Sequence, residues 1–251
     1  MNIIRLPVAN RRCSTVETED RPDEVDCQAC GLDPMCSLLD YGETGSGVPQ
    51  GVLLRRRPLE RGRTICREGE PFGSLFAIKS GSFKSLVSTG RLEQVVGFHL
   101  AGELMGTEGM AKGTYPCTIQ ALEDSQVCEL RLDRLPETGK TLELVQQRII
   151  RLLGHEVAFN HALISTLVHN RAEQRVSGFL LNLSDRLKQR DMPYHVFSLE
   201  MTQSDIGSFL GLTNATVSRV LARLQKSGLI SLRHREIRIL DSDTLRTTAQ
   251  S

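Results

Sequence analysis

The sequence lacks the features of a membrane-spanning or secreted chain. Its 251 residues contain no apolar run of about 18 residues, the length needed for a helix to cross a bilayer. The opening segment, Met1 to Pro7, is too short for the apolar region of a signal peptide. The seven cysteines form an odd set and do not suggest a secreted disulfide framework. We therefore expect a cytoplasmic protein with reduced thiols.

The sequence also lacks the motifs of common catalytic sites. It has no Ser-His-Asp grouping, no phosphate-binding loop and no dinucleotide-binding glycine pattern, and its six histidines are scattered. A redox or metal enzyme with a regulatory tail is an alternative without a supporting motif. With 39% apolar and 24% charged residues the composition is that of ordinary globular domains. We predict a globular protein that is not an enzyme.

The net charge is only +1, but the charges are unevenly distributed along the chain. From Glu17 to Asp40 eight acidic residues stand against Arg21 alone. From Thr202 to Leu240 six lysines and arginines stand against Asp205 and Glu236. A basic region of this kind is the electrostatic footprint of phosphate contacts. We therefore expect the C-terminal region to bind double-stranded DNA.

Three cysteines near the N-terminus, Cys27, Cys30 and Cys36, have the spacing of metal ligands. Three thiolates are one fewer than a closed zinc or iron-sulfur site needs, so a fourth ligand must come from elsewhere. No second Cys-x2-Cys pair is present, which argues against an ordinary zinc finger. The spacing leaves four candidates for the fourth ligand, Cys13, Cys66, Cys117 and Cys128.

The pattern along the chain predicts an α+β fold with four parts. Residues 1–50 form a polar, cysteine-bearing segment that would struggle to build a core without a bound metal. Residues 51–138 alternate short apolar runs with glycines, which is typical of a β-roll. Residues 139–170 are a dimerisation helix, and residues 171–251 are a winged helix-turn-helix domain. The apolar runs of the roll include Leu75–Ile78, Gln94–Leu100 and Cys117–Leu122.

A long helix without proline is predicted from Leu142 to about Val168. Spacings of four and three residues trace the seam of a coiled-coil dimer. A polar Asn160 within that seam favours two strands in fixed register. The alternative is a long amphipathic helix that packs on its own domain. The seam residues are Ile150, Leu153, Val157, Asn160, Ile164 and Leu167.

The region after residue 171 has the pattern of a winged helix-turn-helix. A helix is predicted over Arg171–Leu187, and Thr202 with Asp205 three residues later forms a capping pair for a second helix. Thr213 caps a third helix that ends at Gly228. Its inner face has Val217, Leu221 and Leu224, and its outer face has Asn214, Ala215, Ser218, Arg219 and Ala222. Residues 229–239 alternate apolar and polar side chains around a basic tip, which predicts a hairpin wing.

The third helix is expected to lie in the major groove of DNA. Arg219 is the main candidate for reading a base, since its guanidinium can bond guanine O6 and N7 together. Ser218, Thr216 and Asn214 complete the base-reading set. The alternative for each charged residue is an ordinary solvated surface. Phosphate contacts are predicted for Arg223, Lys226, Arg233 and Arg235.

Five parts of the sequence, spread over most of the chain, carry a family resemblance. They are Cys27-Gln-Ala-Cys-Gly-Leu-Asp-Pro-Met-Cys36, Phe76-Ala-Ile-Lys-Ser-Gly81, Val96-Gly-Phe-His-Leu-Ala-Gly-Glu103, Gln120-Ala-Leu-Glu-Asp-Ser-Gln-Val-Cys-Glu129, and Asp205-Ile-Gly-Ser-Phe-Leu-Gly-Leu-Thr213 through Gln225-Lys-Ser-Gly-Leu229. Together they resemble the CRP/FNR transcription regulators, and among these the oxygen-sensing FNR branch.

The resemblance implies a cofactor and partners. It implies that Cys128, in a Val-Cys-Glu context, is the fourth ligand and that Cys27, Cys30, Cys36 and Cys128 hold a [4Fe-4S] cluster. It further implies a homodimer that binds a palindromic DNA site while the cluster is intact. Oxygen attack would destroy the cluster, and RNA polymerase is an expected partner. The other cysteines, Cys13, Cys66 and Cys117, are then ordinary small apolar residues.

The sequence departs from the FNR pattern at three places. Ala215 stands where a Glu commonly precedes the Thr-Val-Ser-Arg run, so one base contact is missing. Asn160 stands where the best-known FNR-type regulator has an Asp, which removes a like-charge repulsion across the dimer. The turn Ser88–Gln94 is one residue shorter than the polymerase-contacting loop, so contacts there are not carried over.

Other ligands remain open from the sequence. A cyclic-nucleotide-gated member of the family would keep Gly102-Glu103, which is present, and an Arg-Ser pair for the phosphate, which is not. Between Met110 and Cys117 only Lys112 is basic. The cysteines could instead hold a structural zinc ion or a [2Fe-2S] centre.

Overall fold

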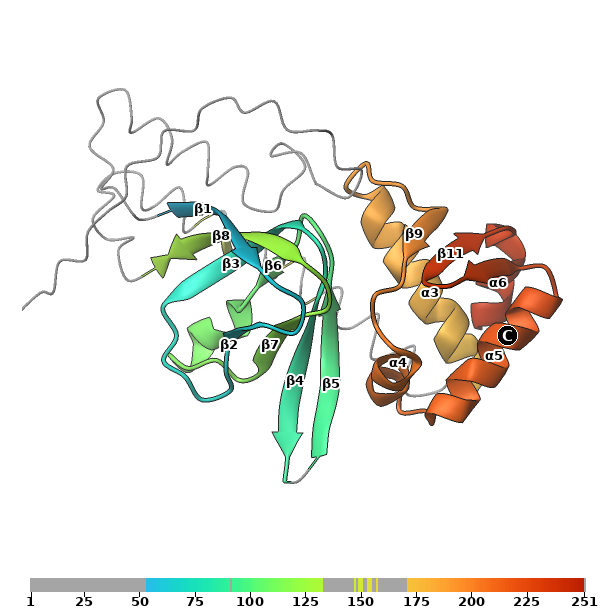
Figure 1. Ribbon diagram of the computed structural model, residues 1–251, viewed down its shortest axis with the longest axis horizontal. Helices are drawn as coiled ribbons and strands as arrows, with labels where there is room; N and C mark the ends of the chain where they lie inside the picture. Colours follow the sequence, from blue (N-terminus) through green and yellow to red (C-terminus); the bar gives the residue numbers. More distant parts are fainter. Residues whose placement is uncertain are drawn as a thin grey trace, which may run out of the picture.

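The computed structural model describes residues 53–90, 92–132 and 171–250, and six helical residues between 147 and 157. Within these ranges the chain forms an N-terminal β-roll and a C-terminal domain of four helices with a small sheet (Figure 1). The predicted α+β class, with a roll preceding a winged helix-turn-helix, is confirmed. The coiled coil stays a prediction.

The β-roll consists of two four-stranded antiparallel sheets. Their strand orders are β1-β8-β3-β6 and β2-β7-β4-β5. The β4–β5 hairpin extends beyond the rest of the roll (Figure 1). The strands are β1 (Leu53–Leu59), β2 (Thr64–Cys66), β3 (Ser74–Ser80), β4 (Phe83–Thr89), β5 (Leu92–His99), β6 (Leu104–Met105), β7 (Thr118–Ala121) and β8 (Ser125–Arg131), and a short 3-10 helix, η3, spans Thr107–Ala111.

Apolar residues of both sheets bury each other and form the core of the roll. Strand β3 lies in the middle of its sheet and six of its seven residues are buried, as expected for a strand covered on both faces. The β3–β4 turn needs glycine at position 81, because its φ is +86° and a Cβ would lie 2.1 Å from Oγ of Ser125. The central core residues include Phe76, Ile78, Phe83, Met105, Ile119 and Val127.

The C-terminal domain is built around helix α3 (Ala172–Lys188), which matches the predicted helix. The sheet of this domain has the order β10-β11-β9, so the predicted wing hairpin gains a third strand that was not predicted. The last helix, α6, was not predicted either. The elements after α3 are β9 (Val196–Ser198), α4 (Gln203–Leu210), α5 (Asn214–Lys226), β10 (Ile230–Arg233), β11 (Glu236–Ile239) and α6 (Ser242–Gln250).

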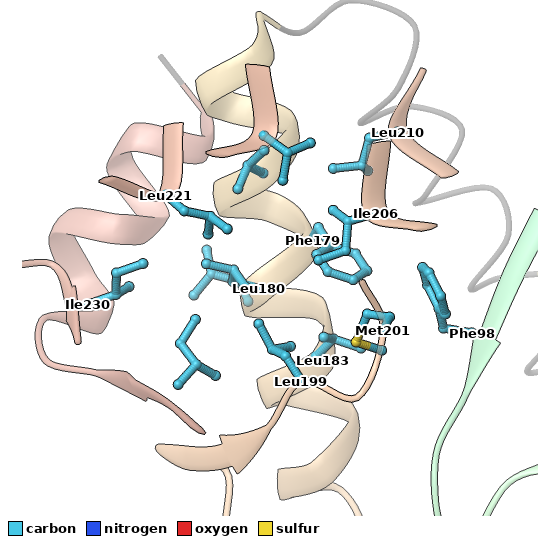
Figure 2. Close-up of a cluster of buried hydrophobic side chains, with 14 of the residues drawn as sticks. Phe98, Phe179, Leu180, Leu183, Leu199, Met201, Ile206, Leu210, Leu221 and Ile230 are labelled. Atoms are coloured by element: carbon cyan, nitrogen blue, oxygen red, sulfur yellow. The ribbon is translucent and has the colours of Figure 1, made fainter. Parts of the chain in front are cut away.

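One continuous apolar cluster holds the C-terminal domain together. Phe179, Leu180 and Leu183 of α3 lie at its centre, with Ile206 of α4 and Leu221 of α5 packed around them (Figure 2). Phe98 of strand β5 joins the same cluster from the roll (Figure 2). The two domains therefore share part of one core.

The residues described between 147 and 157 are helical, as predicted. Ile149 is buried, whereas two predicted seam residues, Ile150 and Val157, are 67% and 54% exposed in the single chain. Leu153 is half-buried. The other seam residues, Asn160, Ile164 and Leu167, lie outside the described residues. None of the helices among the described residues is long and apolar enough to cross a membrane.

Candidate nucleic-acid interface and cysteine ligands

Helix α4 begins with the capping pair that the sequence predicts. The Thr202 hydroxyl accepts a hydrogen bond from the backbone N–H of Asp205 at 3.1 Å, and the Asp205 carboxylate accepts from the backbone N–H of Thr202 at 3.0 Å. Two backbone groups that would otherwise lack partners at the helix start are satisfied in this way.

The turn between α4 and α5 depends on two glycines. Gly211 ends α4 in the left-handed region, with φ +65°. Gly207 lies inside α4, and a Cβ at this position would come within 2.6 Å of the carbonyl oxygen of Leu212. The close approach fixes the angle at which α5 leaves α4. The requirement at Gly207 was not predicted, although a glycine inside a helical pattern is a recognisable signal of close packing.

Helix α5 has the two faces that the sequence predicts. Val217, Leu221 and Leu224 are buried, and Val220, which was not predicted, is buried beside them. Thr213 caps the helix by accepting from the backbone N–H of Thr216. Gly228 follows the helix at φ +72°, as expected of a residue just past a helix end. The exposed outer face consists of Asn214, Ala215, Ser218, Arg219 and Ala222.

The four predicted base-reading residues occupy the N-terminal two turns of α5. Asn214, Ser218 and Arg219 are exposed, whereas Thr216 is half-buried and its hydroxyl lies 2.8 Å from that of Thr213. The Nε of Arg219 donates to the carbonyl oxygen of Ala215 at 3.1 Å. This bond leaves the two terminal nitrogens of the guanidinium for a bidentate contact with guanine. Base reading by these side chains stays a prediction.

The predicted phosphate-binding residues differ in their surroundings. Lys226 and Arg233 are exposed on α5 and at the end of β10. Arg223 donates to Glu173 of α3 at 2.9 Å, and Arg235 is paired with Glu200. All four are solvent-accessible, so the two pairs can exchange their carboxylates for a phosphate at small cost. Phosphate contact by each of them stays a prediction.

The wing is a hairpin whose register matches the predicted alternation. Ile230 pairs with Ile239 and Arg233 with Glu236, so the basic tip consists of His234 and Arg235. His234 adopts φ +56°, a conformation that the two-residue turn requires. The wing and α5 therefore place exposed basic residues on the same domain.

The three described cysteines have different environments. Cys66 and Cys117 are each 3% exposed in the core of the roll. Burial, the largest cause, raises the pKa of the Cys66 thiol to about 12 and that of Cys117 to about 11. Cys128 on β8 is only half-buried and pairs with Ala77 of β3. The expected burial of Cys66 and Cys117 is confirmed, whereas their exclusion from the ligand set stays a prediction.

The donor set of the proposed metal site is described only in part. Cys27, Cys30 and Cys36 lie outside the described residues, as does Cys13. Within the residues that the structure describes, no group of three or more His, Cys, Asp or Glu side chains could hold a metal ion. A thiolate is the form that binds iron or zinc. Burial raises the pKa of Cys66 and of Cys117, which disfavours the thiolate form of these two cysteines.

Two domain families match this chain. Residues 174–248 match the Crp-like helix-turn-helix domain, and residues 56–140 match the cyclic nucleotide-binding domain. The transcriptional activator protein Anr of Pseudomonas aeruginosa is 39% identical over 221 residues, which cover 87% of this chain and 90% of the relative. The fumarate and nitrate reduction regulatory protein of Escherichia coli is 36% identical over 222 residues, which cover 88% and 89%. The chain belongs to the CRP/FNR family.

Solved structures of CRP/FNR proteins share this fold. FixK2 from Bradyrhizobium japonicum superposes with a TM-score of 0.68 at 25% identity, and the match covers 78% of this chain and 98% of FixK2. A CooA mutant from Carboxydothermus hydrogenoformans superposes with a TM-score of 0.61 at 19% identity, covering 78% and 87%. The chain is a DNA-binding transcription regulator of this family, whose members act as dimers.

The roll of this CRP/FNR protein differs from a nucleotide pocket at Glu103. The sequence resemblance compares this carboxylate with the one expected to bind a ribose in cyclic-nucleotide-gated members. Here it accepts hydrogen bonds from Arg186 of α3 and from the backbone N–H of Leu100. It is therefore already satisfied by protein donors, which agrees with the missing Arg-Ser pair in the sequence.

Proposed function

We propose that this regulator responds to oxygen through a [4Fe-4S] cluster held by Cys27, Cys30, Cys36 and Cys128. The main observation that supports Cys128 as the fourth ligand is its half-exposed position on β8, whereas Cys66 and Cys117 are buried. Among the three cysteines of the described roll, Cys128 alone is not buried, so its thiol is the one that we expect to meet a cluster bound by the N-terminal cysteines. The names of the FNR-type relatives, which refer to fumarate and nitrate reduction, support the same conclusion.

The chain's own residues would have simple roles in this scheme. The four thiolates would bind the cluster and tie the N-terminal cysteines to strand β8. When bound, the cluster would supply the group that oxygen attacks. Since ligand binding and local order are coupled, cluster loss would weaken whatever the bound segment supports at the dimer helix. DNA binding would then follow the dimer state.

The proposed partners are a palindromic DNA site and RNA polymerase. Helix α5 would enter the major groove, with half-sites about one helical turn apart in a dimer. The exposed Arg219 would read guanine, while Lys226 and Arg233 would contact phosphates. The protein would thus regulate transcription under anaerobic conditions.

Anaerobic purification followed by controlled exposure to air tests the proposal. We expect visible absorbance, with iron and sulfide in equal amounts, and loss of both the absorbance and binding to a palindromic site when air enters. A colourless zinc protein, or DNA binding that is indifferent to air, would contradict it. A stable [2Fe-2S] centre in the anaerobic protein would contradict the cluster type.

Matched cysteine substitutions test the ligand set. Cys128→Ala is expected to prevent cluster assembly and anaerobic DNA binding. Cys117→Ala and Cys66→Ala, which alter buried thiols of the same roll, are expected to leave the iron content unchanged. An iron content that falls only in Cys117→Ala would reverse the assignment.

The dimer is proposed to depend less on the cluster than in FNR-type proteins with Asp at the position of Asn160. A neutral Asn removes like-charge repulsion across the seam. Sedimentation of the protein without its cluster should show dimers at micromolar concentration, and Asn160→Asp should convert them to monomers. Monomers alone in the unsubstituted protein would contradict this proposal.

A further inference from the structure

The roll and the DNA-binding domain meet along an apolar contact. The ring of Phe98 on β5 lies 5.7 Å from that of Phe179 on α3 and 5.1 Å from that of Phe209 on α4, measured between centroids. A bulge in the β4–β5 pairing accompanies this contact, and the backbone N–H of Val95 donates to Oγ of Ser208 at 2.9 Å. Helices α3 and α4, which precede α5, the proposed recognition helix, therefore both contact the roll.

A buried ionic cluster lies beside this apolar contact. Nε of Arg186 on α3 donates to Oε1 of Glu103 at 2.8 Å, and its Nη2 donates to Oε2. Nη2 of Arg190 lies 3.3 Å from Oε1 of the same carboxylate. The side chains of Glu103 and Arg186 are each only 11% exposed. A two-point contact between a guanidinium and a carboxylate fixes orientation as well as distance.

Backbone hydrogen bonds hold the Glu103 side of the cluster in the roll. The N–H of Gly102 donates to the carbonyl oxygen of Ile78 at 2.8 Å, and the N–H of Ile78 donates to that of Glu103 at 2.9 Å. Nη2 of Arg186 also donates to the carbonyl oxygen of Phe98 at 2.7 Å. Arg186 therefore contacts two separate points of the roll. An exposed ion pair between flexible side chains would not restrain the domains in this way.

The cluster keeps its charges across the physiological pH range. Burial alone would raise the pKa of Glu103, but Arg186, Arg190 and the N–H of Leu100 outweigh it and lower the pKa to about 2. The carboxylate of Glu103 is therefore ionised at neutral pH, as its contact with Arg186 requires. Since α5 packs against α3 within one apolar cluster, the position of α3 on the roll also sets the position of α5.

We propose that Arg186 is a positioning residue for DNA binding, which clamps Glu103 and thereby fixes the recognition helix relative to the roll of its own chain. The proposal rests on the proposed binding of a dimer to a two-fold site. In such a dimer the rolls and the predicted dimer helices would form the common body, so a fixed position of each α5 would favour one half-site spacing. We call the Arg186–Glu103 contact the clamp. When the clamp is loosened, the effective concentration of the second protomer's α5 at the correct spacing falls, and the protein accepts a broader range of half-site spacings.

The ratio of affinities for two DNA probes tests the clamp. One probe has the palindromic site with its natural spacing, and the other has two base pairs inserted between the half-sites. Full-length protein, purified anaerobically, is titrated with each. We expect the unsubstituted protein to prefer the natural spacing by about tenfold or more, and Arg186→Gln and Glu103→Gln to reduce this preference to about threefold. The reduction should come from weaker binding to the natural site, with binding to the inserted site unchanged.

Control variants separate positioning from folding. Asp185 lies on α3 next to Arg186, but its ion pair with Arg246 of α6 lies within the DNA-binding domain. Asp185→Asn removes this pair and should leave the ratio of affinities unchanged. Arg186→Lys keeps the charge and loses the two-point geometry, so it should fold and still lower the ratio. A general loss of folding would weaken binding to both probes equally.

The outcomes distinguish this inference from the proposed function. If the unsubstituted protein binds the palindrome no better than unrelated DNA, the proposed function fails. If the unsubstituted protein prefers the palindrome, but Arg186→Lys and Glu103→Gln keep its full preference for the natural spacing, the positioning role of Arg186 is overturned and the proposed function stands. The double variant Arg186→Gln with Glu103→Gln should be no worse than either single variant, and additive effects on the ratio would also overturn the clamp.

Discussion

Nζ of Lys84, on strand β4 of the roll, lies 2.7 Å from Oδ1 of Asp205, in the first turn of helix α4. Oδ2 of the same carboxylate accepts from the hydroxyl of Thr202 at 2.7 Å and from its backbone N–H. One side chain thus caps the first helix of the helix-turn-helix and ties it to the roll. Burial would raise the pKa of Asp205, but the bonds from Lys84 and Thr202 outweigh it and lower the pKa.

Removal of either partner should therefore have unequal effects. Asp205→Ala loses the cap and leaves Lys84 without its carboxylate, and we expect the free energy of unfolding to fall by about 2–3 kcal/mol. Lys84→Met leaves the cap intact and should cost about 1 kcal/mol or less. Urea denaturation of both variants measures the difference. Equal losses would mean that the cap contributes nothing beyond the ion pair.

Two buried serines of α3 provide a matched pair for a second prediction. The hydroxyl of Ser177 is fully buried and has no hydrogen-bond partner among the residues that the structure describes, whereas that of Ser184 donates to the carbonyl oxygen of Tyr194 at 2.7 Å. Ser177→Ala removes an unsatisfied polar group and improves helix propensity, so it should stabilise the protein by about 1 kcal/mol. Ser184→Ala should destabilise it by about 1 kcal/mol. Thermal unfolding of the two variants should shift the midpoint in opposite directions.

Local sequence signals predicted much of this structure. The Thr202–Asp205 cap, the end of α5 at Gly228 and the alternation of the wing each depend on a few neighbouring residues. The glycine-punctuated apolar runs likewise predicted strands of the roll. In each case the physical cause lies within one or two turns of chain.

The contacts between the domains could not be predicted in the same way. Lys84 and Asp205 are 121 positions apart, and Arg186 and Glu103 are 83 apart. Nothing in the local pattern around Glu103 distinguishes a nucleotide ligand from a partner of α3. The fourth cysteine was chosen by resemblance, and only the fold separates the half-buried Cys128 from the buried Cys117. Such pairings depend on how whole domains pack.

A third prediction concerns acid stability and His99. Its Nε2 lies 2.7 Å from Oγ of Ser85. The charges of Glu103, Glu108 and Arg186 also act on the ring. Burial, the largest cause, lowers the pKa of His99 below its usual 6.5, so the folded protein keeps a neutral ring where the unfolded chain would bind a proton. Stability from this site is complete above pH 6.5 and declines as the pH falls below it.

Urea midpoints between pH 7.5 and about 5 measure this decline. The unsubstituted protein should lose stability over this range, and His99→Gln, which can keep a bond to Ser85 but cannot titrate, should lose less. His195→Gln is the control, because it removes a different histidine outside the roll. Parallel pH profiles for the unsubstituted protein and His99→Gln would contradict the assignment.

The last prediction concerns base recognition at Ala215. This residue is exposed on the outer face of α5, one turn before Arg219, and its carbonyl oxygen accepts from Nε of that arginine. A glutamate here could accept from cytosine N4 and could also contact Arg219 four residues later. Ala215→Glu should therefore increase discrimination at one base pair of each half-site by about tenfold, which corresponds to about 1.4 kcal/mol and lies within the range of about 1–3 kcal/mol for a good base contact.

Competition among probes that carry all four base pairs at each half-site position measures this change. Ala222→Glu is the matched control, since it adds the same charge to the same exposed face two turns further from the N-terminus of α5. It should weaken binding to every probe alike through repulsion of phosphates. An unchanged base profile in Ala215→Glu, with only a uniform loss of affinity as in the control, would mean that position 215 does not face the bases. The proposed docking of α5 would then need a different orientation in the groove.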